Sequence, residues 1–184
     1  KTFIGYRRYV EGVWDSSNKR LAGADAATPF HAPRLHADRA TGRLVVGWHQ
    51  SLDDDNDGLT IWAVVGELAD TLQGTAVAVT TLEKQGAITG RSAAISPTVQ
   101  VGVDGAGNAM LVWRQRLVAD NGRDVDARIQ VAQRPVGGSW SDAQVLDLAE
   151  DVFTRSGARL AMSASGDAFV AWQSAERQPV NVQV

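Results

Sequence analysis

A seven-residue motif that occurs three times constrains the fold of this chain more than any other feature. Gly42–Trp48, Gly107–Trp113 and Gly166–Trp172 each contain a Gly, a polar residue, four small or apolar residues and a Trp. A stretch of alternating apolar residues and a turn rich in small and polar residues precede each copy. Alternation, a turn and a second apolar run are typical of a β-hairpin. We expect the Gly that opens each motif to adopt a positive φ.

A second element recurs in register with the hairpin. Phe3–Trp14 is similar to Ile129–Trp140, and Leu59–Glu67 keeps the strand of this element in the middle copy. The motif tryptophans are 65 and then 59 residues apart. Each period has room for about four strands, a pattern typical of propeller blades. The sequence therefore predicts an all-β fold of four-stranded antiparallel blades of the β-propeller type, with about three repeats; a β-sandwich and a linear β-solenoid are the alternatives.

We expect residues 1–184 to form a single propeller segment. Its units are 1–30 (partial), 31–95, 96–155 and 156–184 (partial), with Pro179–Val184 as a further third strand. Three periods are too few to close a propeller of six or more blades. The chain is therefore expected to gain further blades from a longer polypeptide or to associate as a homo-oligomer.

Composition excludes several classes of function. The formal net charge is −3 and no basic stripe is present, so we expect no nucleic-acid partner. The apolar runs are too short for a membrane span. The chain has no cysteine, which rules out disulfides, thiolate zinc sites and a cysteine nucleophile.

The full repeat resembles a known family of blades. Ser96–Leu146 reads Pro, alternating apolar residues, Asp-Gly-x-Gly-Asn-Ala, an apolar run and Trp, followed by Ile-x-Val-Ala-x-Arg-Pro-x-Gly-Gly-x-Trp. This pattern resembles the Trp-containing blade repeats of large secreted bacterial sialidase-like β-propeller proteins. The resemblance implies an extracellular, periplasmic or cell-envelope location. The Arg-Ile-Pro motif and the Asp-boxes of sialidases are absent, so sialidase chemistry is not expected.

An acidic loop is the candidate metal site. Asp53, Asp55 and Asp57 alternate ahead of Gly58, as at the start of a calcium-binding loop. Oxygen ligands at alternating positions can surround one Ca²⁺, and the Gly permits a sharp turn. The EF-hand position for a bidentate Glu is occupied by Val64, so this is not an EF-hand. We predict a calcium loop of another kind; a solvated acidic turn is the alternative.

Tryptophans are the candidate ligand contacts, because exposed indole rings stack on sugars. Trp48, Trp113 and Trp172 recur at one position of the repeat and are expected in the core. Trp62 departs from the repeat pattern and is the candidate for a ligand-binding contact.

The remaining ionisable residues suggest no catalytic arrangement. His31, His36 and His49 all lie in the first full repeat, but no nucleophile or acid accompanies them at a recognisable spacing. Arg8 and Arg134 align in the repeat and are expected to form structural salt bridges. The sequence thus favours a non-catalytic binding or scaffold module that takes a protein or glycan ligand. A carbohydrate-binding propeller, closed by oligomerisation, is the alternative, and a sialidase-like glycoside hydrolase is a more remote one.

Overall fold

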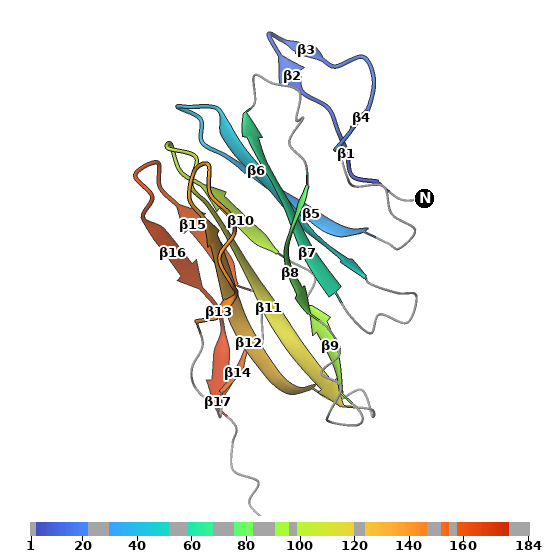
Figure 1. Ribbon diagram of the computed structural model, residues 1–184, viewed down its shortest axis with the longest axis vertical. Coiled ribbons are helices and arrows are strands. Elements are labelled where there is room, and N and C mark those ends of the chain that lie inside the picture. Colours follow the sequence, from blue (N-terminus) through green and yellow to red (C-terminus); the bar gives the residue numbers. More distant parts are fainter. Residues whose placement is uncertain are drawn as a thin grey trace, which may run out of the picture.

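The computed structural model contains only strands, turns and loops in the part of the chain that it describes (Figure 1). It describes residues 3–21, 30–51, 59–67, 76–82, 91–95, 99–119, 124–146, 152–154 and 158–176. No described element is a helix that could cross a membrane. The predicted all-β fold class is confirmed. The predicted strand Pro179–Val184 lies outside the described residues.

The first complete sheet is an antiparallel meander of four strands. They are β5 (Phe30–Ala37), β6 (Arg43–Ser51), β7 (Leu59–Glu67) and β8 (Val77–Leu82), in that order across the sheet. Along β6, Leu44 and Val46 face one side, while Val45 faces the other, and all three are buried. A strand that is buried on both faces needs a continuous apolar run, which explains the composition of the repeated motif.

The second sheet has the same four-stranded plan with a broken first strand. Its path is β10 (Gln100–Val103), β11 (Ala109–Ala119), β12 (Asp124–Arg134) and β13 (Gln144–Val145). The further strand β9 (Arg91–Ile95) pairs with the later part of β11, on the edge that β10 uses earlier. β9 and β10 are therefore two halves of one edge strand. β5 has a register shift at the corresponding place, between His31 and Arg34.

Parts of the same plan occur at both ends of the described chain. Two first-strand pieces, β14 (Val152–Thr154) and β15 (Arg159–Met162), pair with two second-strand pieces, β17 (Ser174–Glu176) and β16 (Ala168–Ala171). At the other end, β1 (Gly5–Tyr6) pairs with β4 (Lys19–Arg20), and the hairpin of β2 (Tyr9–Val10) and β3 (Val13–Trp14) lies between them in sequence. The β1–β4 pair repeats β12–β13: Leu21 N donates to Ile4 O, as Leu146 N donates to Ile129 O.

The sheets stack face to face (Figure 1), with β10 against β5 and β6 on one side and against β15 on the other. One apolar cluster fills each interface. The cluster between the first and second sheets contains Val45, Ile61, Ala63, Val99, Val101, Val103, Ala109, Leu111, Trp113 and Ala132. The cluster between the second and third contains Val112, Ile129, Val131 and Ala158, with Met110, Leu160 and Val170 packed against it. A third cluster joins Ile4 and Leu21 to the outer face of the first sheet.

Neighbouring hairpins are joined by hydrogen bonds at or near their turns. Val103 N donates to His36 Nδ1 at 3.1 Å, and Gly105 N donates to Ala164 O at 3.0 Å. The opening glycines of the three motifs have φ values of 73°, 98° and 94°, so the predicted left-handed conformation is confirmed. Consecutive repeats are therefore linked both through their cores and through their turns.

The motif tryptophans are buried in two of the three repeats. Trp48 and Trp113 are fully buried, as predicted. Trp113 Nε1 donates to Gln130 Oε1 at 2.9 Å, which satisfies the indole inside the core. Trp172 was also expected in the core, but it is 36% exposed. It lies in the last described sheet, and no further sheet among the described residues covers this face.

Gly47 provides a test of the packing between the first two sheets. A Cβ at this position would lie 2.6 Å from Val101 Cγ1, and that branched, buried side chain has no room to move away. We expect Gly47→Ala to destabilise the chain by about 1–3 kcal/mol, measured by urea unfolding. The control is Gly5→Ala, where the nearest atom would lie at 3.4 Å. A loss that is equal in both variants would contradict close packing at Gly47.

Candidate functional site

The described residues contain no cluster of metal-ligating side chains. No group of three or more His, Asp or Glu in these ranges could hold a metal ion. Asp53, Asp55 and Asp57 belong to residues 52–58, which lie outside the described residues. The calcium loop therefore stays a prediction.

The three histidines do not form one site, because His36 contacts the second sheet whereas His31 and His49 pair within the first. His31 and His49 are register partners on β5 and β6, and His49 is buried. His36 accepts a hydrogen bond from the second sheet through Nδ1. His36 is thus a link between sheets.

The predicted salt bridge of Arg8 is confirmed, since its Nε lies 3.4 Å from Asp15 Oδ2. The Arg8 backbone N–H also donates to this carboxylate and is the main cause that holds the pKa of Asp15 below its ordinary value. The alignment of Arg8 with Arg134 is one residue out of register. Asp15 N donates to Arg8 O, whereas Ser141 N donates to Gln133 O, so Gln133 is the structural counterpart of Arg8.

Trp62 occupies a position of the repeat that holds Gln130 in the second sheet. It is the register partner of Trp48, as Gln130 is the register partner of Trp113. Its side chain is half-buried and packs against the cluster beneath the first sheet. Its Nε1 is buried and has no hydrogen-bond partner among the described residues. A ligand contact at Trp62 stays a prediction, and only the remaining exposed part of the ring could make it.

Asp104 organises the turn of the second hairpin. Its carboxylate is buried and accepts hydrogen bonds from Gly107 N, Asn108 N and Asn108 Nδ2 at 2.7 to 2.8 Å. Burial is the largest single influence on the pKa of Asp104 and raises it, but the hydrogen bonds from Asn108 and Gly107 together hold it below its ordinary value. Asn108 Oδ1 then accepts from Val136 N, which ties this turn to the end of β12.

The turn of the third hairpin has an equivalent hydrogen bond, with Ser163 in place of Asp104 and Asp167 in place of Asn108. Ser163 Oγ accepts from Asp167 N, where Asp104 Oδ1 accepts from Asn108 N. Between these two turns lies a pocket of about 540 Å³ that is lined by both polar and apolar residues, here called the turn pocket. It is lined by Asp104, Asn108, Gln133, Arg134, Met162 and Ser165, among others. Its donors and acceptors suit a polar ligand.

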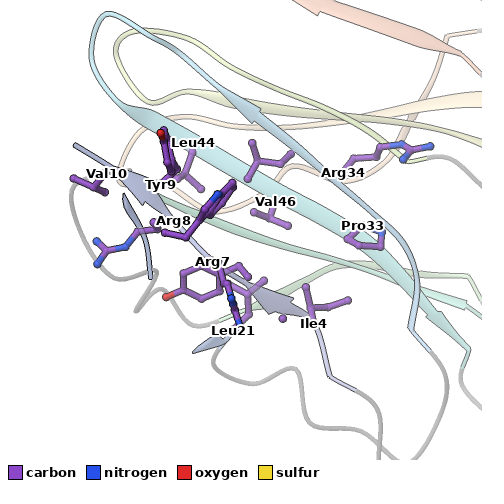
Figure 2. Close-up of a pocket in the computed structure, with 14 residues that line it drawn as sticks. Ile4, Arg7, Arg8, Tyr9, Val10, Leu21, Pro33, Arg34, Leu44 and Val46 are labelled. Carbon is purple, nitrogen blue, oxygen red and sulfur yellow. The ribbon is translucent and has the colours of Figure 1, made fainter. Parts of the chain in front are cut away.

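A second cavity, of about 510 Å³, lies between the N-terminal segment and the first sheet (Figure 2). We call it the N-terminal groove. Ile4–Val10, Trp14 and Leu21 line one side, and Pro33, Arg34, Leu35, Leu44 and Val46 on β5 and β6 line the other. Its walls are mainly apolar side chains. Leu35 is 60% exposed, although it lies in the middle of a strand.

Two aromatic side chains of the N-terminal segment are among those that line this groove. Tyr9 and Trp14 are register partners on the β2–β3 hairpin, and their ring centroids are 5.1 Å apart. Both rings are largely exposed. Sequence analysis missed this pair as a candidate contact, because Trp14 aligns with Trp140, and a tryptophan that recurs in a repeat suggests core packing. Trp140 is indeed half-buried against the core.

No family model matches the chain, and no curated protein is significantly similar to it.

The contribution of Asp104 to the free energy of unfolding is expected to depend on pH. Removal of the carboxylate by Asp104→Ala leaves two backbone N–H groups without their acceptor, which is expected to cost about 1–3 kcal/mol at pH 7. Because the folded-state pKa lies below the ordinary 3.8, the contribution of the charged carboxylate is complete above that value and is lost as the pH falls through the folded-state pKa. The difference between wild type and variant in urea unfolding should therefore shrink in acid. The exposed Asp142, changed to Ala, is the control; an Asp104→Ala cost that does not vary with pH would contradict this role.

Proposed function

We propose that this chain is a non-catalytic binding or scaffold module of an extracellular or cell-envelope bacterial protein, and that its sheets are consecutive blades of a β-propeller. The observation that carries the proposal is the repeated geometry between sheets. The first strands β5, β10 and β15 are neighbours along the stack, and adjoining hairpins hydrogen-bond to one another at or near their turns. Radially arranged blades bring their first strands together in this way.

The function as a binding module is supported by the rigidity of the turns. Asp104, Asn108 and Val136 form a continuous chain of hydrogen bonds, and Gly105 extends it to the next repeat. Loops that are held by a rigid scaffold are common positions for recognition. The turn pocket lies among these turns, so we assign ligand recognition to it.

A polar ligand fits the turn pocket because of the side chains that line the pocket. Arg134 and Gln133 supply donors, and Met162 supplies an apolar wall. An arginine can bind a carboxylate in a bidentate manner. The ligand class that follows is an acidic or hydroxyl-rich group on a protein or a glycan.

Carbohydrate binding is the second candidate function. The exposed, adjacent rings of Tyr9 and Trp14 favour it, because aromatic faces pack against the C–H faces of sugars. This candidate places the ligand on the β2–β3 hairpin and not in the turn pocket.

One set of measurements distinguishes a binding function from a catalytic function. On a glycan array and on immobilised extracellular proteins, we expect binding that Arg134→Ala weakens roughly 10- to 150-fold, since a charge-assisted hydrogen bond contributes about 1.5–3 kcal/mol. Val77→Ala, on the exposed part of β8, is the control. Loss of binding on Trp14→Ala alone would favour the glycan site instead. Hydrolysis of a fluorogenic sialoside would overturn a non-catalytic function.

Calcium binding to Asp53, Asp55 and Asp57 is proposed as a separate, structural property. Four acidic residues within five positions repel one another unless solvent or a cation neutralises them. Calorimetric titration is expected to show one Ca²⁺ per chain, with a higher melting temperature than in chelator. Asp55→Asn should abolish both effects, and Asp142→Asn should change neither. No heat and no change in melting temperature would leave a solvated turn.

A further inference from the structure

We propose that the turn pocket binds a protein segment with one basic and one acidic side chain, the basic one beside Asp104 and the acidic one beside Arg134. The inference rests on the proposed function and specifies the ligand, which is a polypeptide and not a glycan. It follows from a comparison of the two places where the turn of one hairpin meets the turn of the next.

At the first of these places, a basic side chain of the chain itself fills the space over the following turn. Arg43 comes directly after the Gly that opens the first motif, and its Nη1 lies 2.6 Å from Glu67 Oε1. A Cβ on Gly107, in the turn of the second hairpin, would lie 3.6 Å from both Cδ and Nε of Arg43. The stem of Arg43 therefore lies over the glycine of the next repeat, while Glu67 pairs with its charge.

At the second place, the chain lacks this ion pair. Asn108 follows the motif Gly of the second repeat, as Arg43 follows that of the first. By continuation of the strand register, Pro135 lies opposite Asn108, where Glu67 lies opposite Arg43. Asn108 is short, and its amide is held inside its own turn. The turn pocket, with Gly166 in its wall, lies where the pair is missing, between two hairpins whose lining residues are all described.

Asp104 provides the negative charge of the pocket. Its Oδ1 accepts from two backbone N–H groups, whereas its Oδ2 accepts from Asn108 Nδ2 and has a second lone pair. A Cβ on Gly166 would lie 3.0 Å from Asp104 Oδ2, so this oxygen faces the third turn. Burial raises the pKa of Asp104, but the hydrogen bonds from Asn108 and Gly107 hold it below its ordinary value, so the carboxylate is ionised at neutral pH. A cationic group above Gly166 would meet a charged acceptor.

Arg134 provides the opposite charge. It lines the pocket, it is half-buried, and no described residue forms an ion pair with it. A guanidinium group can bind a carboxylate through two parallel hydrogen bonds. The pocket therefore has one charge of each sign, and a ligand with one charge of each sign is complementary to both.

The walls of the pocket favour a polypeptide over a sugar. Met110, Pro135 and Met162 supply its apolar surface, and none of the lining residues is aromatic. Sugars pack their C–H faces on aromatic rings. Methionine side chains instead adapt to irregular apolar shapes, such as the methylene stem of an arginine or a lysine. In the first repeat, the corresponding space is also filled by a protein side chain, that of Arg43.

The first experiment titrates the intact chain with a capped peptide, acetyl-Gly-Arg-Gly-Glu-Gly-amide, and follows the backbone amide resonances by NMR. Residues two positions apart lie on the same side of an extended peptide, so this probe presents both charges together. We expect the resonances of Gly107, Asn108 and Gly166 to shift. The affinity should be roughly tenfold or more above that of two control peptides, one with citrulline in place of Arg and one with Gln in place of Glu.

The second experiment assigns each charge of the peptide to its partner by double-mutant cycles. Arg134→Gln should weaken binding of the Arg/Glu peptide roughly tenfold and leave the affinity for the Gln control peptide unchanged. Asp104→Asn should weaken binding of the Arg/Glu peptide and leave the affinity for the citrulline control peptide unchanged. Asp142→Asn, at an exposed position outside the pocket, should change none of these affinities. Circular dichroism checks that each variant is folded.

The outcomes distinguish this inference from the proposed function. Equal affinity for the Arg/Glu peptide and the citrulline peptide, with a loss on Arg134→Gln, overturns the inference and supports recognition of an acidic group alone. A sialylated or a neutral oligosaccharide that shifts the same resonances, while the peptides do not, overturns the polypeptide ligand and leaves the pocket to a glycan. If neither peptides nor oligosaccharides shift these resonances, the recognition assigned to the turn pocket is itself wrong.

Discussion

The burial of both faces of each sheet against its neighbours is the constraint on which the rest of the structure depends. A sheet that is covered on two sides can carry a continuous apolar run such as Leu44–Val46, and its hydrophobic stabilisation comes from contact with the next repeat. The contact is close: Gly47 lies against Val101, and no side chain fits between them. Each repeat is therefore stable only together with its neighbours, as in other repeat proteins.

The turns follow from the same stacking. Once two hairpins are held side by side, Val103 N lies beside His36, and Gly105 N lies beside the carbonyl of Ala164. Asp104 then fixes the conformation of its turn from within. The turns are thus polar, whereas the interfaces between the stacked sheets are apolar. A ligand at the turns would meet fixed donors and acceptors, so little conformational entropy would be lost when it binds.

The period of the sequence predicted the strands and their order, because both depend on local alternation and on glycine turns. The positive φ at Gly107 and the burial of Trp113 were predicted in this way and are confirmed. The equivalence of Trp62 with Gln130 could not be predicted, since it depends on pairing across the sheet and not on spacing along the chain. The exposure of Trp172 was not foreseen for a similar reason, because burial of a repeated residue requires a following sheet. The two pockets, formed by residues far apart in sequence, had no signal in the pattern.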